Sequence, residues 1–472
     1  MASNPHVLAI FFPLQGHINP MIQLCNRLVS KGIRVTFVTT ASFSKNLEKQ
    51  PHQHADSNLI SMEAVPDSTS DEAHEALDIY EAFFRSFRAA MISGLSEIVA
   101  KYSNSREPLT AIVYDSCLPW MLDFAHEKGL KGAVLFTQPA AVCSVFHHVY
   151  KGSLEISHDE ASEVSLPGLP VLAVKDLPSL LYDVRGYGAI LRTLVEQFST
   201  FEKADWRLFN TFDKLEDEVL KWMGKGCKIQ TIGPTVPSMC TDKRIPGNYD
   251  YGLCFFKPKT ESFIKWLDSK EDRSVIYVSF GSLADLSEKQ LEEVAWGLIK
   301  TKCNFLWVVR DTEQSKLPQY LTSDLVERGL IVNWCTQLQV LSHRAVGGFF
   351  SHCGWNSTLE ALVLGVPMVV MPQWADQTTN AKLIVDMWKT GVRVKADGNG
   401  IVTRDEVAAR LNEVMQRESG DEIRRNVLKW KDLAIEAVSE GGSSDNNITE
   451  FADELFSTFR NIHQQKLAPA RL

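Results

Sequence analysis

Residues 334–377 of this chain read WCTQLQVLSHRAVGGFFSHCGWNSTLEALVLGVPMVVMPQWADQ. An apolar run at 346–350 and another at 366–371 have the length and composition of buried strands. Between them lies a glycine turn at Gly354, followed by apolar residues at helical spacing, and Gly365 ends the expected helix. This alternation of strand, turn, helix and strand predicts an α/β fold.

The turn before this helix has the features of an anion site. The first N–H groups of a helix have no partner within the helix, and the helix dipole places partial positive charge there. We expect Asn356 or Ser357 to be the N-cap. A phosphate would then lie between Gly354 and Ser357, with His352 as a further donor.

A second interpretation of the same residues requires no ligand. Ser357 and Glu360 are three residues apart, which is the spacing of a capping box, and spacing alone does not separate the two interpretations. The surroundings favour a ligand. Trp334 and Trp355 offer aromatic planes for a base, and Gln337 is one of several amides and carboxylates that suit paired hydroxyls.

The first forty residues predict a second ligand-binding edge. The run at 7–12 is continuously apolar, as in a strand buried on both faces, and 33–39 is a further strand. Between them, Asn19 and Pro20 predict the N-cap and first residue of a helix. The loop 13–18, which contains His17, should therefore lie at the carboxyl edge of the first strand, where open α/β sheets bind ligands.

The rest of the chain repeats this alternation. Further strands are expected at 111–114, 133–136, 274–280, 305–309 and 330–332, and helices at 77–95, 189–204 and after Ser287. Between 234 and 259 the pattern breaks into a mixture of Pro, Gly, Asp, Lys and Tyr, which predicts an interdomain linker. There is no G-x-G-x-x-G, so a dinucleotide site of the usual kind is not expected, and there is no D-x-D for a divalent metal.

Composition narrows the class of protein. A chain of 472 residues, 44% hydrophobic and 23% charged, predicts two or three globular domains. The net charge of −9 argues against nucleic acids and anionic membranes as general partners. No apolar run reaches the roughly 18 residues of a membrane span. Nine cysteines without C-x-x-C spacing predict reduced thiols, as in a cytoplasmic protein, rather than disulfides or a zinc site.

The 44-residue run at 334–377 resembles, nearly letter for letter, the signature box of plant family-1 UDP-dependent glycosyltransferases. The run PLQGHINP at 13–20 is similar to the catalytic loop of the same family, so the resemblance covers both halves of the chain. It implies the GT-B fold, in which two Rossmann-like α/β domains face each other across a cleft. The expected parts are an acceptor-binding domain (1–241), a linker (242–260), a UDP-sugar-binding domain (261–450) and a C-terminal helix that packs back on the first domain (451–472).

The resemblance also implies a mechanism. His17 is expected to take the proton of the acceptor hydroxyl, and Asp115, at the end of its strand, to orient and stabilise the imidazole. One in-line displacement would then invert the anomeric carbon and give a β-glycoside. The residues expected at the UDP-sugar are Gly16, Thr137, Ser282, Trp334, Cys335, Gln337, His352, Gly354, Trp355, Asn356, Ser357, Glu360, Asp376 and Gln377. Gln377, where the resembling enzymes that use galactose have His, points to glucose.

The acceptor pocket is the part that the sequence describes least. Bulky apolar residues in the N-terminal half suggest a small lipophilic acceptor such as a phenolic, steroid or terpenoid, with a hydroxyl or carboxyl to modify. From position, the expected contacts are Phe83, Phe87, Trp120, His147, Tyr182, Phe198 and Trp374.

The sequence thus predicts a monomeric, cytoplasmic UDP-glucose glucosyltransferase that needs neither metal nor cofactor. Two other functions are considered. A sugar-nucleotide epimerase or hydrolase on the same fold would need no acceptor, and no second acid or base cluster near His17 supports it. A non-catalytic binder of small molecules would not need the His17–Asp115 pair.

Overall fold

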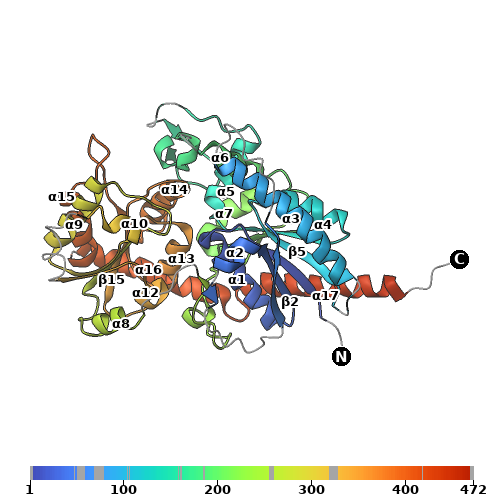
Figure 1. Ribbon diagram of the computed structural model, residues 1–472. Helices are drawn as coiled ribbons and strands as arrows, with labels where there is room; N and C mark the ends of the chain where they lie inside the picture. Colours follow the sequence, from blue (N-terminus) through green and yellow to red (C-terminus); the bar gives the residue numbers. More distant parts are fainter. Residues whose placement is uncertain are drawn as a thin grey trace.

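The computed structural model describes residues 4–46, 48–49, 59–67, 79–103, 105, 107–157, 159, 162–183, 187–254, 260–317, 328–416 and 418–467. Figure 1 shows two α/β lobes side by side, with the N-terminal half of the chain in one and most of the C-terminal half in the other. Each lobe is built on its own parallel sheet.

The N-terminal lobe contains a seven-stranded sheet in the order β10-β9-β6-β5-β1-β2-β4. All of its neighbouring strands are parallel. Its central strands are buried on both faces, as the continuous apolar runs predicted. The strands are β1 (His6–Ile10), β2 (Arg34–Thr40), β4 (Ile60–Val65), β5 (Leu109–Asp115), β6 (Lys131–Phe136), β9 (Trp206–Phe209) and β10 (Gln230–Thr231).

The C-terminal lobe contains a six-stranded parallel sheet in the order β14-β13-β12-β15-β16-β17. The order reverses at β12, and crevices that bind ligands form at such switch points. The strands are β12 (Val275–Ser279), β13 (Asn304–Val308), β14 (Gly329–Val332), β15 (Val346–Ser351), β16 (Met368–Val370) and β17 (Gly391–Arg393). The strands expected on both sides of the glycine turn are therefore confirmed.

Helices cover both sheets. Those of the first half are α1 (Gln15–Ser30), α2 (Ala41–Asn46), α3 (Ile79–Ser103), α4 (Trp120–Glu127), α5 (Ala140–Tyr150), α6 (Gly188–Glu196) and α7 (Asp213–Met223). Those of the second half are α8 (Thr260–Asp268), α9 (Glu288–Thr301), α10 (Asp311–Gln314), α12 (Gln337–Leu341), α13 (Trp355–Leu364), α14 (Gln377–Lys382), α15 (Arg404–Gln416), α16 (Glu418–Val438) and α17 (Ser443–Leu467). Small strand pairs join β3 (Glu48–Lys49) to β11 (Leu253–Cys254) and β7 (Glu163–Val164) to β8 (Leu172–Ala173). Single turns are η2 (Val174–Asp176), η3 (Ser179–Leu181), η4 (Ser238–Cys240) and η6 (Leu383–Met387).

Two of the expected helix starts are wrong, for the same reason. Helix α1 begins at Gln15 and carries Pro20 in its second turn, so Asn19 does not cap it. Helix α13 begins at Trp355 with Gly354 as N-cap. Helix α1 begins five residues after the end of β1, and α13 begins four residues after the end of β15, both earlier than the cap residues predict. Capping propensity alone does not fix where the helix begins after a strand. The Ser287 cap of α9 is confirmed, since its side chain accepts from Gln290 N.

The C-terminal helix α17 lies along the N-terminal lobe (Figure 1). Its apolar residues Ile448, Phe451 and Leu455 belong to the same buried cluster as the strands β1 and β2. The Phe451 ring contacts Trp206 edge-to-face at 5.1 Å between centroids. The last helix of the chain therefore completes the core of the lobe that is formed by the first half of the chain.

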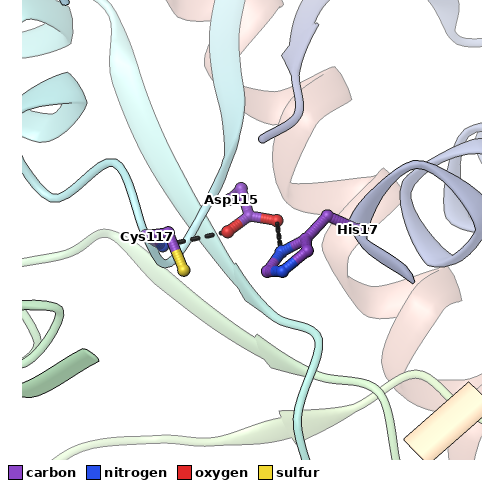
Figure 2. Close-up of side chains that lie close together, drawn as sticks. All are labelled: His17, Asp115 and Cys117. Carbon is purple, nitrogen blue, oxygen red and sulfur yellow. Dashed lines mark hydrogen bonds and ion pairs between the residues drawn. The ribbon is translucent and has the colours of Figure 1, made fainter. Parts of the chain in front are cut away.

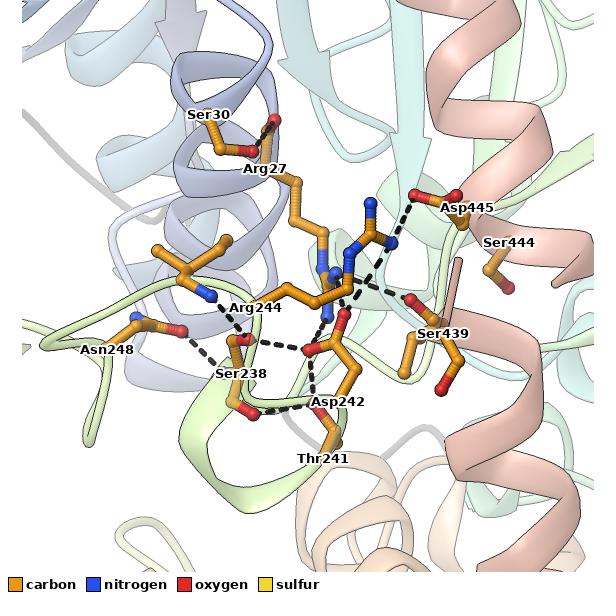
Figure 3. Close-up of polar contacts among 12 residues, drawn as sticks. Arg27, Ser30, Ser238, Thr241, Asp242, Arg244, Asn248, Ser439, Ser444 and Asp445 are labelled. Atoms are coloured by element: carbon orange, nitrogen blue, oxygen red, sulfur yellow. Dashed lines mark hydrogen bonds and ion pairs between the residues drawn. The ribbon is translucent and has the colours of Figure 1, made fainter. Parts of the chain in front are cut away.

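The connection between the lobes is pinned by a buried ion pair (Figure 3). Arg27 of α1 donates to both carboxylate oxygens of Asp242, at 2.7 and 3.0 Å, and the Asp242 side chain is 1% exposed. Ser238 also donates to Asp242, at 2.6 Å, and Arg244 links this site to Asp445 of α17 at 3.0 Å. The connecting segment is therefore held by the first helix of the chain, α1, and by the last helix, α17. Within the described part of the chain, no helix is long and apolar enough to cross a bilayer.

Candidate active site

An imidazole lies on the first turn of α1 with a carboxylate behind it (Figure 2). His17 Nδ1 is 2.8 Å from Asp115 Oδ2, and the Asp115 side chain, at the end of β5, is fully buried. The Thr137 hydroxyl is 3.2 Å from the same nitrogen. Since Nδ1 faces the carboxylate, its proton is donated there, and Nε2 is left as the basic nitrogen.

The pair tunes the basicity of His17. Burial on its own lowers the pKa of the imidazole, but the negative charge and hydrogen bond of Asp115 more than offset this, so the pKa lies above its ordinary value of 6.5. Asp376, in the other lobe, acts in the same direction. The imidazolium that forms on proton transfer is therefore stabilised.

Cys117 completes a group whose potential metal-ligand atoms all lie within 4.8 Å of one another, with His17 and Asp115. The two oxygens of Asp115 are engaged, because Oδ1 accepts from Cys117 N at 2.9 Å and Oδ2 from His17. Burial and the neighbouring carboxylate raise the pKa of the Cys117 thiol well above its usual range. With both carboxylate oxygens already accepting hydrogen bonds, and one of them from the imidazole, these contacts fit proton transfer.

His17 opens onto a cavity of about 980 Å³ between the two lobes. Its walls come from the residues that follow β1 and from α1, α3 and α6 on one side, and from β12, α12, α13 and the turn before α14 on the other. At its centre the lobes touch, because Asn356 Nδ2 donates to the Gly16 carbonyl at 2.9 Å. The first turn of α1, which carries Gly16 and His17, and the helix N-terminus expected to bind an anion thus face one space.

The N-terminus of α13 is open toward this cavity. Gly354 is the N-cap of this helix, and Gly354, Asn356 and Ser357 all line the cavity, so a ligand there can meet the first N–H groups of the helix, which have no partner within it. His352 lies beside them, and burial lowers its pKa to about 4, which keeps the imidazole neutral. Two glycines hold this ring closely: a Cβ at Gly281 (φ +79°) would lie 2.6 Å from Nε2, and one at Gly354 would lie 2.7 Å from it.

The capping-box interpretation of Ser357 and Glu360 is wrong. Ser357 accepts from Gln337 Nε2 at 2.9 Å, and the same amide donates to Glu360 Oε2 at 2.8 Å. Glu360 Oε1 accepts from the Tyr251 hydroxyl at 2.8 Å. The Glu360 side chain is directed at other elements rather than at its own helix start, and burial raises its pKa to about 7.

The turn before α14 presents an acid and an amide to the cavity. Asp376 accepts from Asn380 Nδ2 at 2.7 Å, and burial raises its pKa to about 6. Gln377 Oε1 accepts from the backbone N–H groups of Gln373 and Trp374, at 2.9 and 3.2 Å. These bonds hold the turn so that both side chains line the cavity.

The structure brings together every residue expected at the UDP-sugar. All of them line the cavity: Gly16, Thr137, Ser282, Trp334, Cys335, Gln337, His352, Gly354, Trp355, Asn356, Ser357, Glu360, Asp376 and Gln377. Trp355 also joins the two lobes, because its indole N–H donates to the Asn210 carbonyl of the other lobe at 2.7 Å and the residue is 4% exposed.

The acceptor end is different from the expectation. Phe83 and Trp374 line the cavity, but five of the expected residues do not, namely Phe87, Trp120, His147, Tyr182 and Phe198. Phe198 stacks on Phe136 in the core, and His147 packs against Phe198. Position near a loop does not reveal which side chains are directed at the cavity, and these two pack against core side chains instead.

The remaining three have other partners. Phe87 is 6% exposed and packs against Phe12, Trp120 lies under the Arg88 guanidinium, and the Tyr182 hydroxyl donates to the Lys175 carbonyl. The apolar wall is instead formed by Phe12, Tyr80, Phe84, Leu180, Tyr187, Ile190 and Leu194. Tyr187, Ile190 and Leu194 recur at helical spacing, which is the sequence signal that could have found them.

Two Rossmann-like lobes, with a His17–Asp115 pair on one and a helix N-terminus at the cavity on the other, are the fold and site of a GT-B glycosyltransferase. Known proteins agree. A family model described as UDP-glucoronosyl and UDP-glucosyl transferase matches residues 247–434, and a glycosyltransferase N-terminal domain matches 4–168.

UDP glycosyltransferase 9 of Catharanthus roseus is 46% identical over 463 residues, which are 95% of this chain and 97% of that protein. A crystal structure of Os79 from O. sativa in complex with UDP is 35% identical, with a TM-score of 0.86 over 95% of this chain and 100% of the other. UGT2 of Phytolacca americana, complexed with UDP-2fluoro-glucose and pterostilbene, is 28% identical, with a TM-score of 0.80 over 96% and 99%.

The chain belongs to the UDP-glucoronosyl and UDP-glucosyl transferase family. The family, the GT-B fold and the class of enzyme expected from the sequence are confirmed, and so is glycosyl transfer from a UDP-sugar to a small acceptor.

Proposed function

We propose that this chain transfers glucose from UDP-glucose to a hydroxyl of a small lipophilic acceptor, with His17 as the base. The observation that carries the proposal is the position of His17, which has Asp115 at its back and the shared cavity in front. Nε2 takes the acceptor proton while the oxygen attacks the anomeric carbon, and the bond to UDP breaks on the opposite face. This single displacement converts an α-linked donor into a β-glucoside.

The donor is assigned to the C-terminal lobe. The α13 N-terminus and the neutral His352 donate to the diphosphate, whose negative charge grows as the bond breaks. Trp334 stacks on uracil, with Cys335 beside it, and Glu360 with Gln337 receives the ribose hydroxyls. The glucose lies between Thr137 and the turn carrying Asp376 and Gln377, with Ser282 toward the phosphates. What supports these roles is that all of these side chains border one cavity.

The acceptor is assigned to the apolar end of the cavity. The Phe12 ring is 5.3 Å from the His17 ring and 5.5 Å from that of Phe84, and Tyr187 packs on Trp374 at 5.4 Å. A flat aromatic or polycyclic molecule would bury its surface against these rings and place a hydroxyl at the base. The related UGT2 structure holds pterostilbene, a molecule of this kind.

No metal and no cofactor take part in the proposed reaction. His17 takes the proton, and hydrogen-bond donors of the protein stabilise the charge of the leaving diphosphate. We also place the protein in the cytoplasm as a monomer. Support for the location comes from the eight cysteines whose side chains the structure describes, none of which forms a disulfide.

The test is turnover of UDP-glucose with a panel of phenols, flavonoids, steroids, terpenoids and carboxylic acids. We expect a β-glucoside to form, with UDP released only when an acceptor is present. Rapid acceptor-free loss of UDP-glucose would support the epimerase or hydrolase function, and donor binding without turnover on any of the panel would support the non-catalytic binder.

Changing Glu360 to glutamine is expected to weaken UDP binding about 10- to 100-fold. At a pH above about 7, where the carboxylate is ionised, the amide removes one of two neighbouring acceptors and the charge, and a hydrogen bond to a charged group contributes about 1.5–3 kcal/mol. Calorimetric titration with UDP measures the effect, and the melting temperature serves as the folding control. Unchanged UDP affinity in a folded Glu360→Gln variant would show that this carboxylate does not bind the ribose.

A further inference from the structure

A tyrosine from the segment between the lobes reaches the carboxylate that is assigned to the ribose. Tyr251 donates to Glu360 Oε1 at 2.8 Å, and Gln337 donates to Oε2 at 2.8 Å. All three side chains border the cavity. The carboxylate is therefore held from two sides, by its own lobe and by the connecting segment.

This arrangement leaves room for a ligand on each oxygen. A carboxylate has about four acceptor positions, two on each oxygen. From the residues that the structure describes, each oxygen of Glu360 accepts one hydrogen bond. One position on each oxygen is then available to a neighbouring pair of hydroxyls, which is the pattern that a ribose presents.

Tyr251 is held in place by the rest of its segment. The carbonyl of Asp250 accepts from Gln23 of α1 at 3.2 Å, and its side chain accepts from Gly252 N at 2.9 Å. Asn248 accepts from Ser238 N at 2.6 Å, next to the buried Arg27–Asp242 pair drawn in Figure 3. The hydroxyl is thus anchored through the backbone to the N-terminal lobe, although its ring packs on the core of the C-terminal lobe.

The hydroxyl also stays protonated. Burial and the adjacent carboxylate raise the pKa of Tyr251 well above its ordinary value of 10.0. It therefore donates to Glu360 across the working pH range, and the acceptor positions of the carboxylate remain directed at the cavity.

We infer that Tyr251 is a positioning residue for the donor ribose, orienting the Glu360 carboxylate so that its two oxygens meet the 2′- and 3′-hydroxyls together. The inference rests on the proposed role of Glu360. If Tyr251 has this role, both the C-terminal lobe and the interdomain segment contribute residues to the donor site. The segment then helps the enzyme to select ribonucleotide over deoxyribonucleotide donors.

The test compares the affinities of UDP and 2′-deoxy-UDP in the wild type and in Tyr251→Phe, which removes only the hydroxyl. We expect Tyr251→Phe to weaken UDP binding about three- to tenfold and 2′-deoxy-UDP binding much less, so that the preference for UDP shrinks. With saturating donor the turnover number should stay close to that of the wild type, while KM for UDP-glucose rises. Tyr249→Phe is the matched control, since Tyr249 belongs to the same segment and is 65% exposed.

The outcomes separate this inference from the donor assignment. If Tyr251→Phe weakens the binding of UDP and 2′-deoxy-UDP equally, or changes neither affinity, the hydroxyl is only a structural anchor and the inference is overturned. A Glu360→Gln variant that keeps the full preference for UDP would instead overturn the ribose assignment itself. In the Glu360→Gln background, Tyr251→Phe should cause little further loss of preference, because the two groups act through one contact.

Discussion

Replacing His17 with alanine is expected to lower the turnover number on an unactivated alcohol by roughly 10²–10⁴-fold, the range that general-base catalysis contributes. The physical reason is that His17, held by Asp115 at 2.8 Å, is the imidazole beside the apolar end of the cavity to which the acceptor is assigned. UDP affinity should be nearly unchanged, because the diphosphate is assigned to the opposite lobe. Steady-state kinetics and calorimetric titration with UDP measure the two quantities.

The acceptor supplies an internal check. An acceptor whose hydroxyl is already acidic needs less help from a base, so the loss in His17→Ala should shrink as the acceptor pKa falls. His126→Ala is the matched control, because His126 also pairs with an aspartate, Asp205 at 2.9 Å, on the exposed surface. Wild-type turnover in His17→Ala would show that another group takes the proton.

Replacing Asp115 with asparagine is expected to lower kcat/KM by about 10²–10³-fold and to move its pH dependence. An amide can donate to Nδ1, which favours the tautomer with the proton on Nε2 and so removes the basic nitrogen. The buried position is otherwise retained, because an amide oxygen can still accept from Cys117 N.

The direction of the pH shift follows from the pKa of His17. The base works in its neutral form, so kcat/KM falls as the pH drops below this pKa, which in the wild type lies above 6.5. Asp115→Asn removes the charge that raises the pKa and leaves the burial that lowers it, so the acid limb should move to lower pH. Thr137→Val, which changes the uncharged neighbour at 3.2 Å, should leave the limb in place. An unmoved acid limb in Asp115→Asn would contradict the pairing.

The donor half of the site was predictable because it is local. Residues 334–377 place strand, turn and helix in one continuous stretch, and backbone geometry then directs Gly354 and Glu360 to the same edge of the sheet. The acceptor half was not predictable, because no pattern along the chain separates Phe198 and His147, which pack against core side chains, from Tyr187, which lines the cavity. That difference is set by packing against elements far away in the sequence.

By itself, the sequence determined the alternation of strands and helices and the residues of the turn at Gly354 that border the cavity, and it singled out His17 as the proposed base, since each depends on residues within a few positions of one another. Only the tertiary structure decided which aromatic residues reach the cavity, that Glu360 is bound by Gln337 rather than capping its helix, and that Tyr251 reaches it from the connecting segment. These are contacts across 23 and 109 residues, and no periodicity along the chain encodes them.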